Sequence, residues 1–599
     1  MSSIEAREQR PAVPANEHEL RKVWNLSFES SDVAQVGGLG AAVATLSKAL
    51  AKDLEVSLFM PSHGRHFDVR FREKLGLGEV RGFVSKGARK GVDGNLYPYT
   101  IGMEGGRFQG LRYFLAKGLD QSTSRWLDDW QIYDGELSYQ KMSLFARAMR
   151  GYVDFLLRED PERIPDIVHA NDWHVIPAAV SVKQALLEKR MNIPLVFTIH
   201  LLNDKGLPWH YMSEDWCGIK DGPHFVNIGG ARRLVTYRDA WSDMSGGKFE
   251  RFGAVEADFV ASVSRSYLQS DVLPSLGLNV SRKAGFIYNG CDWDEDDIRQ
   301  GVLREQAHGM EELAAKPERS DLRRYLLARA LGETGTPVIS EPELSRVVEG
   351  LSGLAGIRKS GSEEPFSDGG ELVLMTGRLD RQKGADVLLR AVPKVLEVLP
   401  ATKFLFLFVP LDGELIDSTV RRAAEYEKNV RVVLGRVPQI YGLAHICADV
   451  YAMPSRWEPF GIAALEAMVT GNPVVGTRVG GIMETVLDVL DDREKGTGRL
   501  VMSEDYRELA RGLTCFIAMM KIDEDVRRGQ RQNVPRLLDI IPYDDVRELV
   551  ALNQSTGSVI RRNCRMRVER HFRPKNAAQM AIKAYEKAFI VSASRNESS

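Results

Sequence analysis

Two glutamates in one short stretch have a spacing that would let them handle a sugar phosphate together. Glu458 and Glu466 lie eight positions apart in PSRWEPFGIAALEAM. The apolar run Val450–Met453 predicts a buried strand that ends in a loop carrying Glu458, and Gly461 opens a predicted helix that carries Glu466. Eight positions are a little over two helical turns, so both carboxylates can face one cleft at different depths. Spacing alone favours a simpler interpretation, a helix-entry carboxylate and a solvent-facing glutamate.

A second stretch of this half brings two cations to the start of a helix. The apolar run Leu372–Thr376 predicts a strand, GRLDRQKG follows it, and a helix comes next. Arg378 at the strand end and Lys383 near the helix N-terminus can converge on one side. Together with the partial positive charge of the helix end, they would bind a pyrophosphate. The alternative is a basic surface loop.

Near the N-terminus, a glycine turn stands between a predicted strand and a predicted helix. The strand is Val23–Phe28, the turn reads QVGGLG and includes Gly37 and Gly38, and the helical pattern runs from Ala41 to Leu50. Glycines allow the backbone to come close to a phosphate, and the helix end supplies N–H donors. Most such glycine pairs mark only a tight turn.

Two further strand ends carry polar side chains that can do chemistry. Asp166–Ala170 predicts a strand followed by NDWH, which contains Asp172, and Pro194–His200 (PLVFTIH) predicts another that ends in His200. Open α/β sheets place their sites at the carboxyl ends of parallel strands, so we expect Asp172 to face the cleft. A lone histidine is more often structural. The aromatic and acidic stretch Trp126–Tyr139 suits either a carbohydrate surface or ordinary core packing.

Composition narrows the class of protein. A chain of 599 residues exceeds one core, and its net charge of −2 gives no basis for charge-driven binding to nucleic acid or a membrane. The five cysteines form no CxxC pair, which argues against a zinc site and favours a reducing compartment. No apolar run reaches membrane-spanning length, and the polar start is no secretory signal. We therefore expect a soluble, cytoplasmic protein, with a homo-oligomer left open.

The strings quoted above resemble the motifs of one enzyme family. PSRWEPFGIAALEAM resembles the donor-binding segment of retaining glycosyltransferases of the GT-B architecture, and GRLDRQKG resembles their diphosphate motif. QVGGLG and HANDWH resemble the K-x-G-G-L and H-x-H-D-W-H motifs of glycogen and starch synthases, especially those of archaeal type. The resemblance implies an α/β fold with two Rossmann-like domains that face a cleft, and a C-terminal helix that crosses back to the N-terminal domain.

The resemblance also implies roles for particular residues. Glu458 and His200 would lie beside the transferred sugar with Asp172, and Glu466 would bind the ribose of the nucleotide. The implied donor site consists of Gly37, Gly38, Arg378, Lys383, Gly461, Ile462 and Glu466. No metal or other cofactor is implied.

The chain departs from the family at three places, and one further residue leaves a choice open. Gln35 replaces the family lysine, Asn171 replaces the second histidine of H-x-H-D-W-H, and Leu201 replaces the asparagine after His200. Arg436 falls where some members use a tyrosine against the base, and arginine does not distinguish adenine from uracil.

The order of these segments predicts five regions. They are an N-terminal tail (1–22), an acceptor-side domain (23–298), a helical insertion with a flexible linker (299–370), a nucleotide-sugar-binding domain (371–570) and a crossover helix with a tail (571–599). A second insertion is predicted at about 523–554, and the sequence assigns chemistry to neither.

These features favour a glycogen synthase type of reaction, in which glucose passes with retention from ADP- or UDP-glucose to an α-1,4-glucan. One alternative is a related transferase with a small acceptor, for example one that makes trehalose. Another is a glucan-binding scaffold of weak activity, which Gln35 and Leu201 favour and the retained Arg378 and Lys383 oppose.

Overall fold

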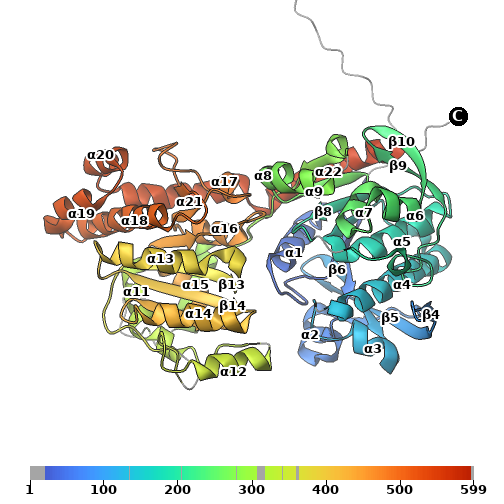
Figure 1. Ribbon diagram of the computed structural model, residues 1–599, viewed down its shortest axis with the longest axis horizontal. Coiled ribbons are helices and arrows are strands. Elements are labelled where there is room, and N and C mark those ends of the chain that lie inside the picture. The colour runs from blue at the N-terminus through green and yellow to red at the C-terminus, as the bar shows by residue number, and fades with distance from the viewer. Residues whose placement is uncertain are drawn as a thin grey trace, which may run out of the picture.

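Two lobes face each other across a cleft in the computed structural model (Figure 1). It describes residues 20–594, except 134, 204–205, 278, 307–309, 311–316, 340 and 359–362. The predicted tails therefore lie mostly outside the described residues. Within these ranges, none of the helices combines the length and apolar character that a membrane crossing requires.

The first lobe is built on a ten-stranded sheet, whose strands follow the order β12-β11-β8-β7-β1-β2-β6-β5-β3, with β4 paired to β5. Strands β12 to β6 run parallel, and β5 adds an antiparallel edge. The parallel strands are apolar runs because helices cover both faces of such a sheet. The strands are β1 (Lys22–Leu26), β2 (Glu55–Pro61), β3 (Gly78–Glu79), β4 (Ser85–Lys90), β5 (Leu96–Phe108), β6 (Leu111–Gly118), β7 (Ile167–Asn171), β8 (Leu195–Ile199), β11 (Phe259–Ser262) and β12 (Ala284–Phe286).

Helices connect these strands, and a separate hairpin, β9 (Pro223–Ile228) with β10 (Ala231–Thr236), stands outside the sheet. The longest helix, α4, packs against α5. The helices are α1 (Gly38–Leu50), α2 (Val69–Leu75), α3 (Gln121–Leu127), α4 (Gly135–Glu159), α5 (Ile176–Leu187), α6 (Tyr237–Asp239), α7 (Phe249–Glu256), α8 (Arg265–Tyr267) and α9 (Leu273–Leu276).

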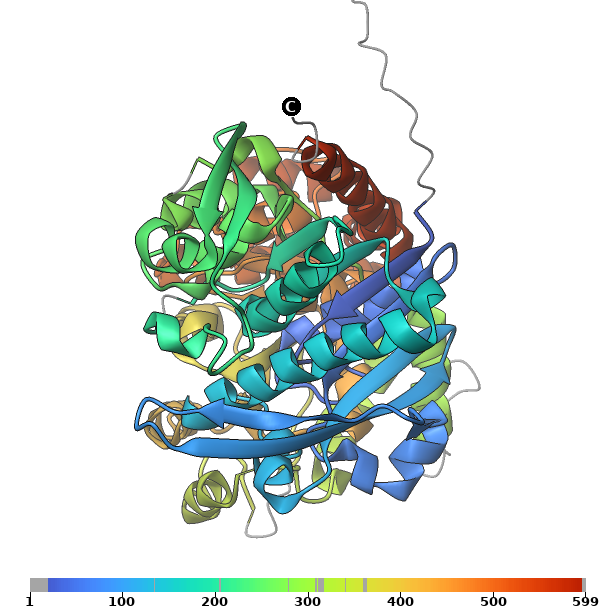
Figure 2. The same cartoon turned by 90° about the vertical axis from the view of Figure 1, so that its right-hand side faces the viewer.

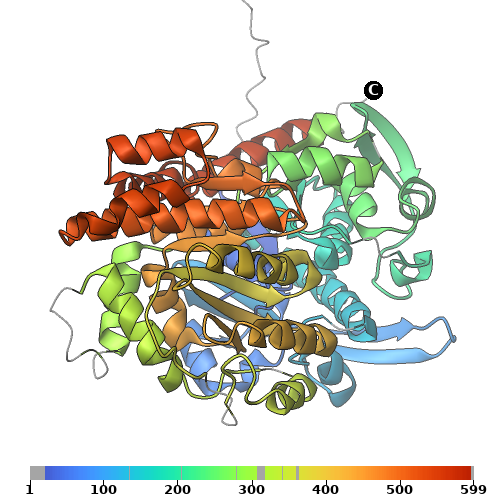
Figure 3. The same cartoon turned by 60° about the vertical axis from the view of Figure 1, so that its left-hand side comes forward.

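The second lobe has a six-stranded sheet that is parallel throughout, in the order β15-β14-β13-β16-β17-β18 (Figure 3). Its strands are β13 (Leu372–Leu379), β14 (Lys403–Pro410), β15 (Val430–Leu434), β16 (Val450–Met453), β17 (Val474–Thr477) and β18 (Gly498–Val501). The helices between them are α13 (Ala385–Leu396), α14 (Gly413–Ala424), α15 (Pro438–Cys447), α16 (Ile462–Val469) and α17 (Ile482–Thr485). The order of the strands along the sheet reverses between β13 and β16. Such a switch point opens a crevice at the carboxyl ends of the strands.

The first predicted insertion belongs to the second lobe. Helices α10 (Glu295–Glu305) and α11 (Arg319–Ala328) pack against α15, and α12 (Pro342–Gly350) packs against α14. The stretch that was expected to be a flexible linker is packed where it is described: Phe366 is buried, and Arg431 of β15 donates to the carbonyl of Glu364 at 2.7 Å. Buried apolar residues between glycines and serines account for this difference.

The C-terminal part completes the second lobe and then returns to the first. Helix α18 (Tyr506–Arg527) continues past the expected start of the second insertion, which holds α19 (Val534–Ile540) and α20 (Asp544–Leu552). After α21 (Thr556–His571), helix α22 (Pro574–Ala593) contacts α1, β8 and β11 of the first lobe (Figure 2). The predicted fold, two Rossmann-like domains with a crossover helix, is confirmed.

Candidate active site

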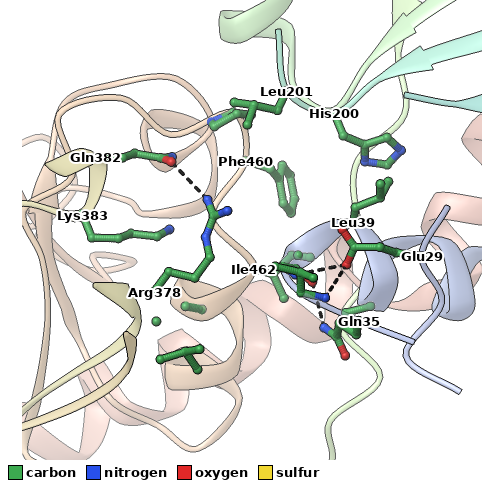
Figure 4. Close-up of a pocket in the computed structure, with 18 of the residues that line it drawn as sticks. Glu29, Gln35, Leu39, His200, Leu201, Arg378, Gln382, Lys383, Phe460 and Ile462 are labelled. Carbon is green, nitrogen blue, oxygen red and sulfur yellow. Dashed lines mark hydrogen bonds between the residues drawn. The ribbon is translucent and has the colours of Figure 1, made fainter. Parts of the chain in front are cut away.

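A cleft of about 1130 Å³ lies between the lobes and is lined by residues of both (Figure 4). This volume is enough for a nucleotide-sized ligand with a second molecule beside it. The cleft brings together every residue that the sequence nominated for the site: Gly37, Gly38, Asp172, His200, Arg378, Lys383, Glu458, Gly461, Ile462 and Glu466.

Glu458 is held in a loop that tight backbone contacts define. Its side chain is buried, and its Oε2 accepts hydrogen bonds from Lys383 Nζ at 2.7 Å and from Ser455 Oγ at 3.3 Å. Gly461, with φ 95°, adopts a left-handed conformation that lets the chain turn into α16. A Cβ at Gly480 would lie 2.0 Å from the carbonyl oxygen of Glu458, so only glycine permits this approach. The strand end and the glycines together fix this carboxylate in the cleft.

Arg378 and Lys383 stand on one wall, as their spacing suggested. Arg378 lies at the end of β13, where its guanidinium is 3.4 Å from both Gln382 Oε1 and Asp380 Oδ2. Lys383 ends the short turn before α13, and its ammonium forms the ion pair with Glu458. The first lobe comes close here: a Cβ placed on Gly37 would lie 3.8 Å from Arg378 Nη1. An anion between the glycine turn and the two cations would meet positive charge.

Glu466 lies on α16, and its pKa is close to neutral pH. Its Oε2 accepts a hydrogen bond from Tyr441 Oη at 3.1 Å. Burial raises the pKa of Glu466 to about 7, although the bond from Tyr441 lowers it. Near neutral pH, Glu466 therefore carries a smaller average charge than an ordinary glutamate.

Glu29 was missed by the sequence reasoning and holds the glycine turn. Its Oε2 accepts from the backbone N–H groups of Val36 at 2.8 Å and Gly37 at 3.0 Å, and its Oε1 accepts from Tyr133 Oη at 2.7 Å (Figure 4). The side chain of Gln35 donates to the carbonyl of Gly37 at 2.8 Å. Glu29 follows the carboxyl end of β1, and the rule that nominated Asp172 could have found it.

His200 is neutral, and a residue at which the chain departs from the family orients its ring. Its Nε2 donates to Asn171 Oδ1 at 3.2 Å, which leaves Nδ1 as an acceptor. Burial lowers the pKa of His200 to about 3. Nearby Asp172 is buried with φ 66°, and desolvation, followed by the charge of Glu250, raises the pKa of Asp172 well above its usual value.

Some residues of the HANDWH motif pack in the protein interior, and others line the cleft. His169 contacts Tyr585 of the crossover helix and Thr198, so it serves packing. His174, which the sequence reasoning left without a role, lines the cleft and packs against Tyr133, with ring centroids 4.5 Å apart and the ring planes tilted by 37°. Of the aromatic stretch Trp126–Tyr139, Tyr133 and Tyr139 line the cleft.

Metal ligands are not grouped in this site. In the part of the chain that the structure describes, no three or more His, Cys, Asp or Glu side chains could hold one metal ion.

Comparison with known proteins agrees with this geometry. A family model of the starch synthase catalytic domain matches residues 22–279, and the model of glycosyl transferases group 1 matches residues 357–533. A glycogen synthase of Exiguobacterium sibiricum is 24% identical over 473 residues, with 78% of this chain and 85% of that protein covered. A glycogen synthase of Thermus thermophilus is 26% identical over 481 residues, with 78% and 87% covered.

A solved structure shows the same fold. The catalytic domain of starch synthase IV from Arabidopsis thaliana, bound to ADP and acarbose, superimposes with a TM-score of 0.60 at 19% identity, with 96% of this chain and 99% of that one covered. The two family models fall on the two lobes that form the cleft, and the curated relatives span both. The chain is therefore a glycosyltransferase that is similar to glycogen and starch synthases in sequence and to starch synthase IV in fold.

Proposed function

We propose that this enzyme transfers glucose, with retention, from ADP- or UDP-glucose to the non-reducing end of an α-1,4-glucan. One observation carries the proposal: Arg378 and the Lys383–Glu458 pair face the glycine turn across a cleft large enough for a nucleotide sugar. The names of the relatives support the glucan product, and the ADP and acarbose bound to starch synthase IV support the two substrate classes.

The leaving diphosphate gains charge as the bond to glucose breaks. Arg378 and Lys383 stand where that charge would develop, and the first N–H groups of α1 add donors from the opposite wall. Because these groups are already in place, they stabilise the transition state without reorganisation. We propose that the reaction needs no metal ion.

The transferred sugar would lie between Glu458 and His200. The Glu458 carboxylate would stabilise the positive charge of an oxocarbenium-like state, and the free Nδ1 of His200 can accept from a sugar hydroxyl. Burial raises the pKa of Asp172 well above its usual value, which favours the protonated form, and that form would donate a hydrogen bond to the sugar. The acceptor hydroxyl would then attack from the face that the diphosphate leaves, which retains the configuration.

We further propose that the enzyme works in the cytoplasm. All five cysteines are buried and unpaired, as expected in a reducing compartment.

Transfer of labelled glucose tests the proposal. ADP-glucose and UDP-glucose are supplied in parallel, with glycogen as the long acceptor and maltose as the short one. Label in polymer supports the proposal and shows the preferred base. Label only in a short oligosaccharide would indicate a small-acceptor transferase, and no transfer by folded protein would favour a scaffold.

A further inference from the structure

The insertion between the lobes reaches the donor wall of the cleft. Val338, within the insertion, pairs with Arg436 as an antiparallel bridge: Arg436 N donates to Val338 O at 2.9 Å, and Val338 N donates to Arg436 O at 3.1 Å. The neighbouring Gly435, with φ 125°, packs so closely that a Cβ there would lie 2.6 Å from the Cβ of Pro337. The insertion thus sets the backbone of a residue that lines the cleft.

Arg436 in turn spans the cleft. Its Nη2 donates to the backbone carbonyl of Gln35 at 2.8 Å, on the opposite lobe. Arg436 lines the cleft, as does Tyr441, the partner of Glu466. Arg436 therefore joins the wall of the second lobe to the glycine turn of the first.

The contact between Arg436 and Gln35 affects the diphosphate site because the glycine turn links Gln35 to Gly37, which faces Arg378. Gln35 is bonded through its side chain to Gly37 O, and Gly37 faces Arg378. A shift of the Gln35 carbonyl would move Gly37 relative to Arg378. Gln35 also replaces the family lysine, so the cation at this point of the cleft now comes from the other lobe.

We propose that the insertion serves the donor site: through Pro337 and Val338 it places Arg436, whose guanidinium holds the glycine turn in register with the diphosphate cations. Arg436 is then a positioning residue for nucleoside-diphosphate glucose, and the insertion is part of the donor-binding apparatus. This inference rests on the proposed function.

Variants at Val338 separate this role from direct contact between Arg436 and the nucleotide. The side chain of Val338 is 62% exposed and does not line the cleft, so Val338→Ala keeps both bridge bonds and is the matched control. Val338→Pro removes the N–H that donates to Arg436 O. Arg436→Ala and the double variant V338P/R436A complete a cycle.

Binding of ADP-glucose and UDP-glucose is measured by calorimetry, and the donor and glycogen KM values by transfer. We expect Arg436→Ala to weaken donor binding about five- to tenfold, within the range of one hydrogen bond of ordinary net strength. Val338→Pro should weaken it about threefold, V338A should match the wild type, and the glycogen KM should stay within about twofold throughout. The double variant should match Arg436→Ala alone.

Additive losses, or a neutral Val338→Pro beside a weakened Arg436→Ala, would overturn the inference, since Arg436 would then act without the insertion. If Val338→Pro lowers the melting temperature, Pro337→Gly replaces it, because it removes the buried Cβ that packs against Gly435, and binding is measured below the melting temperature of each variant. Wild-type protein that binds neither donor would instead refute the proposed function, so the two failures are distinguishable.

Discussion

The two walls of the cleft differ in how they carry charge. Among the described residues that line it, every arginine and lysine comes from the second lobe: Arg378, Lys383 and Arg436. The first lobe contributes Gln35 in place of the family lysine, a neutral His200 and an Asp172 whose pKa is raised.

This difference suggests a division of work. The second wall supplies electrostatic stabilisation from side chains set on strand ends and helix starts, which are rigid. The first wall supplies position, through the glycine turn that Glu29 holds by backbone N–H groups. Variants of Lys383 and Glu458 should therefore lower kcat, and variants of the glycine turn and of its support by Glu29 should mainly raise donor KM.

The largest effect is expected at Glu458. Glu458→Gln keeps the shape of the side chain but removes its charge and leaves Lys383 without its carboxylate partner. We expect kcat to fall by about 10³-fold, with an unchanged fold by circular dichroism. Glu397→Gln, in the exposed Lys394–Glu397 pair, is the matched control. Turnover near the wild-type value would remove Glu458 from catalysis.

The second-largest fall in kcat is expected for Lys383→Ala. Losing one preorganised donor to the diphosphate costs about 10² to 10³ in kcat. Lys394→Ala is the control. Because Lys383 and Glu458 are paired, their double variant should lose less than the product of the two single losses. A loss confined to glycogen KM would place Lys383 in the acceptor site and contradict the assignment.

Stability should depend on pH through Glu466. Its pKa is about 7 in the folded protein against an ordinary value of 4.5, so the folded state binds the extra proton between these values. Stability therefore falls as pH rises through this window, by up to about 3 kcal/mol. Glu466→Gln, which stays neutral, should flatten the decline in melting temperature from pH 5 to pH 8. A decline of equal slope in the variant would assign the effect to other groups, such as Asp172.

On the first wall, Glu29→Gln should raise donor KM about tenfold and leave kcat within about threefold. A glutamine oxygen can accept only part of what the carboxylate accepts, and an unmade hydrogen bond to a charged group costs about 1–3 kcal/mol. Tyr133→Phe removes only the third bond and should cost less. A kcat loss as large as that of Lys383→Ala would break the division between the walls.

The sequence could locate most of this site because of sheet topology. Asp172 and His200 directly follow parallel strands of the first sheet, and Arg378 lies at the carboxyl end of a parallel strand of the second. Glu458 and Glu466 were placed by the strand–loop–helix pattern around them. The positions of these site residues could therefore be predicted from the periodicity and turn residues of short segments.

The features that the sequence did not predict depend on contacts between distant segments of the chain. Glu29 acquires its role from backbone groups of the turn, and Arg436 from a carbonyl on the other lobe 401 positions away. The antiparallel strands β4 and β5 were also missed, because β5 alternates weakly and holds Gly102, Gly105 and Gly106. A stretch rich in glycine and serine suggested a linker. In the structure Phe366 is buried, and Arg431 of β15 donates a hydrogen bond to the carbonyl of Glu364.

The smallest expected effect comes from adding charge to the first wall of the cleft. Gln35→Lys restores a cation to the first wall, at a partly buried position whose side chain bonds Gly37 O. One added charge at this partly buried position should strengthen donor binding by less than about fivefold, and the gain should shrink as salt is raised. Gln35→Met, of similar length without charge, is the control. Donor Kd at low and high ionic strength is the measurement. A gain in kcat beyond about tenfold would mean that the first wall lacks catalytic charge, and the division of work between the walls would fail.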